Sequence, residues 1–307
     1  MPTPEPLSGR KILVTGPTGQ VADPIARALA KDNDVWGLAR FGDAEKRASL
    51  EADGVNCVPL DLETGDFFSL PDDFDYVLNF AVVKTPDFDH DLRCNGESTG
   101  FLMSHCRNVR AFLHCSTTGV YQPKGHDLIS EDDELGDNHR CMMPTYSIAK
   151  ISAEVVVRYA ARQFDIPTII TRLNVPYGNN GGWPYFHLVM MKNDVPIPVH
   201  VDEPSLYTPI HEDDIVAMIP GLISGASVPA RIVNLCGQDH VSIEEWCAYM
   251  GELTGLTPKF EYTKDTIESV KTDNTRLREL VGDARVNWRD GLREMIESRH
   301  PDWLEGA

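Results

Sequence analysis

The 307-residue sequence is poor in basic residues and contains no long apolar run. Lys and Arg number 28 against 47 Asp and Glu, which gives a formal net charge of -19. Such a charge repels nucleic acids and anionic membrane surfaces at long range, although it still permits a local basic pocket for one phosphate group. The composition therefore argues against a polyanionic partner such as nucleic acid and favours a small-molecule substrate.

Targeting and metal-binding patterns are missing too. Residues 2–10 lack the apolar core of a signal peptide, and no run approaches the ~18 apolar residues of a membrane span. The seven cysteines contain no CxxC pair, and the ten histidines show no ligand-like grouping. We therefore expect a cytoplasmic protein that binds neither a membrane nor a metal ion.

Hydrophobic patterning predicts an α/β fold. Strands that are apolar throughout and alternate with helices imply a parallel sheet covered on both faces. The expected fold is a Rossmann-type doubly wound parallel sheet with a smaller C-terminal substrate lobe. Strands are expected at residues 11–15, 34–39, 55–62, 75–81, 110–116, 166–173 and 231–236, and helices at 20–31, 43–53, 92–108 and 146 to about 164.

After Arg172 the regular alternation stops. The segment 174–186 is dense in Gly, Pro, Asn and aromatic residues, which is typical of a loop over a cleft. A helical tail is expected from Ser242 to about Glu297, and it would build the smaller lobe. The expected dinucleotide-binding domain comprises residues 8–174 plus about 208–240, and the expected substrate-binding lobe comprises about 175–207 and 241–307.

The first strand is followed by a glycine-containing turn, VTGPTGQVA at residues 14–22. Glycines between a strand and a helix let the backbone approach a pyrophosphate, while the helix N-terminus offers free N–H groups. A plain tight turn would use the same residue types, but the position directly after the first strand favours a dinucleotide site. The residues expected to bind the cofactor here are Gly16, Thr18, Gly19, Gln20 and Val21.

The end of the second strand bears on the choice of dinucleotide. NAD-specific sites usually place an acidic residue there, which accepts hydrogen bonds from the ribose. Arg40 stands at this position, with Lys46 and Arg47 close behind, and a guanidinium suits the 2′-phosphate of NADP. We therefore expect NADP, with NAD as the alternative if Arg40 is only a solvated surface residue. Further cofactor contacts are expected at the ends of the third and fourth strands, from Asp61, Leu62, Ala81, Val82 and Val83.

Several segments together resemble the short-chain dehydrogenase/reductase superfamily, in particular its extended, epimerase/dehydratase-like branch. They are TGPTGQVA, NFA at 79–81, NGEST at 95–99, STTGVY at 116–121, YSIAK at 146–150, TRLNVPYG at 171–178 and HEDDI at 211–215. The segments occur in the family's order over about residues 11–236. The resemblance implies a catalytic triad of Thr117, Tyr146 and Lys150, and we also expect cofactor contacts from Cys115, Leu173 and Val175.

The chemistry of these residue types agrees with the triad. Positions i and i+4 share one face of a helix, so Tyr146 and Lys150 would project into the same space. A phenol titrates near ~10, and a nearby ammonium or an oxidised nicotinamide would favour the phenolate. Thr117 would polarise the substrate oxygen, Tyr146 would transfer the proton, and Lys150 would hold the nicotinamide ribose. A tyrosine and a lysine four positions apart also occur by chance in many helices.

The substrate segment lacks residues that nucleotide-sugar members of the branch usually carry. Val175 falls at their asparagine position, with Asn174 one place early, and Tyr207 falls near their arginine position. A diphosphate would therefore lack its usual clamp, while aromatic residues offer apolar walls unless they form lobe core. Lys84 could meet an acidic substrate or be a solvated loop lysine, and Asn95 could lie at the site entrance or only cap a helix. The expected substrate contacts are Lys84, Thr117, Thr118, Asn174, Trp183, Phe186 and Tyr207.

Three functional hypotheses follow. The first is an NAD(P)-dependent oxidoreductase that interconverts a carbonyl and an alcohol, or reduces an enone, on a small, partly hydrophobic substrate. The second is a nucleotide-sugar epimerase or dehydratase with an altered clamp, and the third is a dinucleotide-binding protein without catalysis. The helices expected at 92–108 and 144–164 match those through which family members pair, so we also expect a homodimer.

Overall fold

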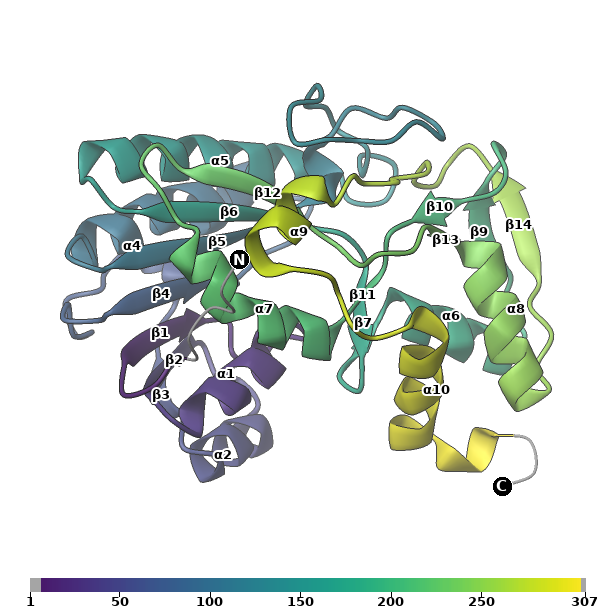
Figure 1. Cartoon of the computed structure of the whole chain (residues 1–307), viewed down its shortest axis with the longest axis horizontal. Helices are drawn as coiled ribbons and strands as arrows, with labels where there is room; N and C mark the ends of the chain where they lie inside the picture. Colours follow the sequence, from purple (N-terminus) through teal and green to yellow (C-terminus); the bar gives the residue numbers. More distant parts are fainter. Residues whose placement is uncertain (1–6, 305–307) are drawn as a thin grey trace.

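The computed structural model describes residues 7–304 as a seven-stranded parallel sheet flanked by helices, with a smaller lobe beside it (Figure 1). The strand order is β12-β6-β5-β4-β1-β2-β3, so the chain winds outward in opposite directions from β1 and β4. The predicted doubly wound fold is confirmed. The sheet strands are β1 (Lys11–Thr15), β2 (Asp34–Ala39), β3 (Asn56–Pro59), β4 (Tyr76–Asn79), β5 (Ala111–Thr117), β6 (Thr168–Leu173) and β12 (Arg231–Leu235).

Helices cover both faces of the sheet because its strands are apolar on both sides. In β1, Ile12 and Val14 belong to one core layer and Leu13 to the other, as the two-residue period of a strand requires. The first layer packs against α1 (Ala22–Ala30), α2 (Ala44–Ala52), α7 (Glu212–Ser224) and α9 (Thr275–Val281), and the second against α4 (Ser98–His105) and α5 (Tyr146–Gln163).

The smaller lobe is built from two separate stretches of chain, which lie on the right in Figure 1. Its core includes Leu188, Trp246, Met250 and Met295, all fully buried. Two short strand pairs connect the stretches: β9 with β14 in parallel, and β10 with β13 antiparallel. The lobe elements are α6 (Trp183–Lys192), β9 (Ile197–His200), β10 (Leu206–Tyr207), β13 (Val241–Ser242), α8 (Ile243–Thr254), β14 (Phe260–Thr263) and α10 (Trp288–Arg299).

The chain after Arg172 is more regular than expected. The segment interpreted as a loop ends inside the first turn of α6, which holds Pro184, and α7 follows later with His211 accepting a hydrogen bond from the backbone N–H of Asp213. Three acidic residues in the first turn of α7 favour its start, because they face the positive end of the helix dipole. These start signals are present in the sequence, so the helices α6 and α7 could have been predicted from it.

The tail after Ser242 is also not a single run of helices. It contains β14, and α9 packs against α7 and β12 on the sheet rather than within the lobe. The local sequence of β14 cannot reveal its partner, because Phe260 pairs with Ile197 far upstream. Residues 305–307, which were expected to end the lobe, lie outside the described residues.

The helix expected at 92–108 starts earlier and is interrupted. Asp87 accepts a 3.1 Å hydrogen bond from the backbone N–H of His90, and this cap starts α3 (Phe88–Leu92). A π-helical turn, η2 (Arg93–Glu97), then joins α3 to α4. The remaining short elements are η1 (Leu62–Thr64), η3 (Thr118–Val120), η4 (Pro301–Trp303), β7 (Pro176–Gly178), β8 (Gly181–Gly182) and β11 (Ile210–His211).

Candidate active site

A cavity of about 470 Å³ opens at the carboxyl ends of the sheet strands and extends to the lobe. This is the edge of a doubly wound sheet where ligands bind, next to the point where strand order reverses. Most of the residues expected from the sequence line it: Gly16, Gly19, Gln20, Val21, Val82, Lys84, Cys115, Thr117, Thr118, Tyr146, Lys150, Leu173, Val175, Trp183, Phe186 and Tyr207. The other expected residues lie outside its lining: Thr18, Arg40, Asp61, Leu62, Ala81, Val83 and Asn174.

The turn after β1 has the geometry of a pyrophosphate cradle. Gly16 has a φ of +69°, and a Cβ there would lie 2.9 Å from the Cα of Ala81, so a larger residue would clash. The Thr15 hydroxyl accepts hydrogen bonds from the N–H groups of Phe80 and Ala81, which brings the ends of β1 and β4 together. Since the N-terminus of α1 follows this turn and lines the cavity, the residues present fit a dinucleotide.

Two side-chain amides connect this turn to the chain beyond β6. Gln20 donates a 3.0 Å hydrogen bond to the carbonyl of Pro176, and Asn180 donates a 2.9 Å hydrogen bond to the carbonyl of Gln20. The glycine-rich segment 178–182 is thus fixed beside the phosphate-binding turn rather than free in solvent.

The cationic cluster inferred near the end of β2 is smaller than the sequence suggested. Lys46 pairs with Asp23 at 3.0 Å and Arg47 with Glu51 at 2.8 Å, so both charges are already compensated. Arg40 is exposed and makes no ion pair within residues 7–304. Arg40 is therefore the one member of this cluster whose charge is left available for a ligand.

The three residues of the expected triad meet at the cavity. Thr117 ends β5, and its hydroxyl oxygen accepts a 3.0 Å hydrogen bond from the N–H of Gly119. Tyr146 is the first residue of α5, and Lys150 follows one turn later. The buried Lys150 ammonium donates a 2.8 Å hydrogen bond to the carbonyl of Cys115 on β5.

Burial dominates the titration of these groups. Loss of solvent raises the pKa of Tyr146 to about 12, although the Thr117 hydroxyl acts in the opposite direction. Burial also lowers the pKa of Lys150. In the protein alone the phenol is therefore protonated at neutral pH, and a positive charge brought in by an oxidised nicotinamide would favour its ionisation.

Lys84 and His139 complete the polar wall around Tyr146. The Lys84 ammonium lies 5.1 Å from the centre of the Tyr146 ring, and the His139 ring centre lies 5.5 Å from it. Burial and the charge of Lys84 lower the pKa of His139 to about 4, so this imidazole is neutral at physiological pH. Desolvation also lowers the pKa of Lys84.

The lobe side of the cavity is aromatic and apolar. Trp183 and Tyr207 pack edge to face with ring centres 4.9 Å apart, and the Tyr207 hydroxyl donates to the backbone carbonyls of Ile267 and Glu268. That hydroxyl is therefore committed to the protein, and Tyr207 presents its ring to the cavity. Asn174 is buried outside the lining, where its side chain donates to the carbonyl of Val270.

Asn95 supports the cavity wall from behind. Its side chain accepts from the N–H of Val83 and donates to the carbonyl of Val83, both at 2.9 Å, and it also donates to the carbonyl of Asp91. The π-helical turn that carries Asn95 thus holds the segment between β4 and α3 in place.

Several lining residues were not anticipated from the sequence. Those adjacent to the quoted segments, such as Phe80 and Ser116, follow directly from the motifs that flank them. His139, Met142 and Met143 precede α5 in an irregular stretch, while Ile267 and Val270 come from the lobe and had no recognisable signal. None of the residues lining the cavity in the described part of the chain carries a carboxylate.

Comparisons with known proteins agree with this architecture. A trifunctional UDP-glucose 4,6-dehydratase/UDP-4-keto-6-deoxy-D-glucose 3,5-epimerase/UDP-4-keto-L-rhamnose-reductase of Arabidopsis thaliana is 24% identical over 332 aligned positions, which cover 96% of this chain and 48% of that protein. The chain thus spans about half the length of the plant relatives it matches.

Solved structures show the same fold. A UDP-glucuronic acid 4-epimerase from Bacillus cereus, in complex with a fluorinated UDP-glucuronic acid analogue and NAD, superposes with a TM-score of 0.82 at 22% identity, over 94% of this chain and 98% of that one. MoeE5 in complex with UDP-glucose and NAD superposes with a TM-score of 0.80 at 23% identity, over 95% and 99%.

A family model decides the classification. The model described as the NAD dependent epimerase/dehydratase family matches residues 12–218, which include the cofactor turn, Thr117, Tyr146 and Lys150. With its parallel sheet and its cavity at the carboxyl ends of the strands, this chain belongs to the NAD-dependent epimerase/dehydratase family of enzymes.

Proposed function

We propose that this enzyme uses a nicotinamide dinucleotide to oxidise and re-reduce a secondary hydroxyl of a nucleotide sugar, with epimerisation as the net result. The meeting of Thr117, Tyr146 and Lys150 at one cavity carries the proposal, because this arrangement supplies a proton donor and acceptor beside a dinucleotide cradle. The similar structures bound to UDP-sugars and NAD support the substrate class. The reductase of a small carbonyl, expected first from the sequence, becomes the second candidate.

Each of the three residues has a distinct task in this scheme. A bound dinucleotide supplies the hydride acceptor and donor. Tyr146 removes the proton of the substrate hydroxyl and later returns it, while Thr117 orients that oxygen by hydrogen bonding. Lys150, fixed to β5 through Cys115, places a positive charge one helical turn from the phenol and favours its ionised form.

The absence of carboxylates from the cavity lining favours epimerisation over dehydration. Elimination of water needs one group to protonate the leaving hydroxyl and another to remove a proton from the neighbouring carbon. Epimerisation needs only the Tyr146 proton transfer, followed by return of the hydride to the opposite face of the carbonyl. Among the described residues lining the cavity, the further titratable side chains near Tyr146 are Lys84, the neutral His139 and the buried thiol of Cys115, and none of them is a carboxylate.

The second candidate is supported by the small number of cations at the cavity. Lys84 and Lys150 are the only cationic side chains in the lining described here, and the lobe side is formed by Trp183, Phe186, Ile267 and Val270. A diphosphate buried without paired donors is costly. Backbone N–H groups in the segment 178–182 would have to replace the missing clamp, since successive backbone amides can bind phosphate.

One experiment separates the candidates. The protein is incubated in deuterated water with UDP-glucose, UDP-glucuronic acid or dTDP-glucose and either NAD or NADP, and products are followed by NMR. We expect a sugar epimer, no net change of cofactor and no deuterium at carbon. Deuterium incorporation would indicate a dehydratase, because the proton removed by a base exchanges with solvent.

A parallel panel of ketones, aldehydes and enones with NADPH or NADH tests the second candidate. Reduction of a carbonyl without turnover of any nucleotide sugar would replace the epimerase proposal with the reductase. The Tyr146→Phe variant serves as the control for both panels, because any activity that survives this change does not come from the site described.

A further inference from the structure

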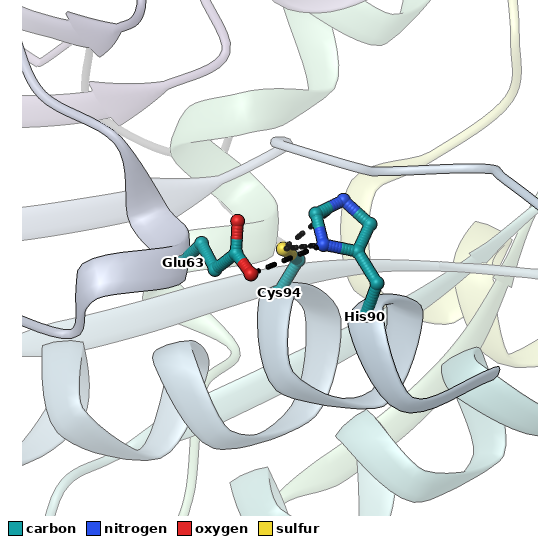
Figure 2. Close-up of side chains that lie close together, drawn as sticks. All are labelled: Glu63, His90 and Cys94. Carbon is teal, nitrogen blue, oxygen red and sulfur yellow. Dashed lines mark hydrogen bonds and ion pairs between the residues drawn. The ribbon is translucent and has the colours of Figure 1, made fainter. Parts of the chain in front are cut away.

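A second cluster of reactive side chains lies away from the cavity. Glu63 of η1, His90 of α3 and Cys94 of η2 converge in Figure 2, and none of them lines the cavity. Their three candidate ligand atoms all lie within 4.8 Å of one another. The cluster combines a carboxylate, an imidazole and a thiol, which are the three side-chain types that bind zinc in proteins.

Two of the three spacings are close to the edges of a tetrahedral site. Glu63 Oε1 lies 3.3 Å from His90 Nδ1, and Cys94 Sγ lies 3.8 Å from the same nitrogen. Tetrahedral zinc with usual bond lengths holds nitrogen and oxygen ligands roughly 3.3 Å apart and nitrogen and sulfur ligands roughly 3.6 Å apart. Cys94 Sγ also lies 3.8 Å from His90 Nε2, and all three ligand atoms lie within 4.8 Å of one another, so a cation can enter between them once the side chains rotate toward it.

The backbone explains why the three residues meet. His90 and Cys94 are four positions apart, so they project from the same side of the helix, as Figure 2 shows. Glu63 lies in η1, far from His90 and Cys94 in the sequence. Asp61 caps η1 by accepting a 3.1 Å hydrogen bond from the Glu63 N–H and so fixes the backbone at Glu63. No sequence motif joins Glu63 to His90 and Cys94, so no metal site was expected from the sequence.

Some charges around the cluster oppose the binding of a cation and others favour it. Arg93 Nη2 lies 3.4 Å from Glu63 Oε1 and competes with a cation for that carboxylate. The carboxylates of Asp61 and Asp91 add negative charge around Cys94, and this charge attracts a positive ion. Cys94 is buried, so a soft cation that replaces the thiol proton would be protected from solvent on the sulfur side.

We propose that Glu63, His90 and Cys94 form a binding site for a thiophilic divalent cation of the zinc type, with a fourth position left for water. On binding, the thiol proton of Cys94 is released to solvent and the sulfur takes the metal in its place. The ion would clamp η1 to α3 and η2. Two of these three elements adjoin residues expected to contact the cofactor: η1 follows Asp61, and η2 carries Asn95, whose side chain bonds to the backbone of Val83.

Cobalt(II) titration of the metal-free protein tests this site directly. We expect the intense visible bands of tetrahedral cobalt and a thiolate-to-cobalt charge-transfer band in the near ultraviolet. Cys94→Ser should abolish the charge-transfer band, and His90→Gln should abolish the tetrahedral spectrum. Zinc should displace the cobalt, and it should raise the thermal unfolding midpoint of the wild-type protein but not of these variants.

Two further variants keep the test decisive. Glu63 lies in an exposed turn, so Glu63→Gln cannot damage the core and should weaken cobalt binding while retaining the thiolate band. Cys141→Ser removes the exposed cysteine outside the cluster and should leave the whole spectrum unchanged. Absence of tetrahedral bands in the wild-type protein, survival of these bands in His90→Gln, or survival of the charge-transfer band in Cys94→Ser would overturn the proposal and leave Glu63 and His90 in a simple side-chain contact.

Discussion

The Lys150 ammonium is held to the backbone carbonyl of Cys115 by a 2.8 Å hydrogen bond. Cys115 lies two residues before Thr117 on β5, while Lys150 lies one turn after Tyr146 on α5. This single bond therefore fixes the helix that carries the proton-transfer group against the strand that carries the polarising hydroxyl.

Replacing Tyr146 with Phe should lower kcat by ~100-fold or more, because a general acid–base group contributes about that much. Dinucleotide affinity should change little, since the phenol is not part of the pyrophosphate cradle. Steady-state kinetics and cofactor titration measure the two effects. Near-normal turnover by this variant would exclude Tyr146 as the proton-transfer group.

Replacing Lys150 with Met should weaken cofactor binding and shift the pH profile of alcohol oxidation. The reaction needs the Tyr146 phenolate, so its rate rises with pH toward the phenol pKa, which burial raises to about 12 in the protein alone. Without the lysine charge, the phenolate is less favoured and the rising limb of kcat/KM should move to higher pH. An unchanged profile would show that Lys150 does not act on the phenol.

Replacing Arg40 with Asp should reverse the preference that we propose for NADP. The wild-type protein should bind NADPH more tightly than NADH because the Arg40 charge is free to meet a 2′-phosphate. In Arg40→Asp the carboxylate repels that phosphate and accepts from the ribose hydroxyls of NADH. Fluorescence titration of both reduced cofactors measures this, with Arg47→Asp as a control at a residue paired with Glu51. Tighter NADH binding by the wild-type protein would refute the assignment.

The exposed apolar face of α4 and α5 should form a two-fold dimer interface. Phe101 of α4 is 55% exposed, and Val155 and Tyr159, one turn apart on α5, are 58% and 63% exposed. A helix that is apolar on its outer face needs a partner. Light scattering should show a dimer for the wild-type protein and a monomer for the Val155→Glu, Tyr159→Glu double variant. Leu135→Glu, at an exposed position elsewhere, should remain dimeric, and a monomeric wild-type protein at micromolar concentration would contradict the prediction.

Protonation of His187 should contribute to loss of stability in acid. Trp246 donates a 2.9 Å hydrogen bond to His187 Nδ1, and burial lowers the His187 pKa from 6.5 to about 3. Between pH 6.5 and about 3 the imidazole of residue 187 binds a proton more readily in the unfolded chain than in the folded one. The stability contributed by neutral His187 is therefore present above pH 6.5 and is lost as the pH falls through this range. His187→Gln should therefore flatten the decline of the unfolding midpoint between these pH values. His126→Gln serves as the control variant. If the decline in His187→Gln equals that in His126→Gln, the acid sensitivity comes from other groups.

The sheet was predictable because its signals are local, whereas the triad was expected from the resemblance to a known family. Each strand of the sheet is a short apolar run. The spacing of Tyr146 and Lys150 indicates that both side chains lie on one face of a helix. The turn around Gly16 was predictable for the same reason as the sheet, since its glycines lie directly between a strand and a helix.

The lobe was less predictable because it is held together by distant pairs. Phe260 pairs with Ile197, and Ile267, which lines the cavity, accepts a hydrogen bond at its backbone carbonyl from the Tyr207 hydroxyl. The start of α7 was not predicted for a different reason. Its acidic first turn lies within the HEDDI segment at 211–215, which was interpreted by family resemblance alone and not as a helix start. His139 comes from an irregular stretch, where periodicity gives no information about which side chains face the cavity.

The pairing of β9 with β14 also sets an order of assembly during synthesis. Ile197 cannot pair until Phe260 has been synthesised, whereas all seven sheet strands are complete once Leu235 has left the ribosome. The sheet and α5, which together carry Thr117, Tyr146 and Lys150, can therefore assemble before β9 and β14 pair, while α9, which packs against α7 and β12, is added after both. A nascent chain stopped between these points would hold the catalytic residues in place while the substrate side of the cavity was still open.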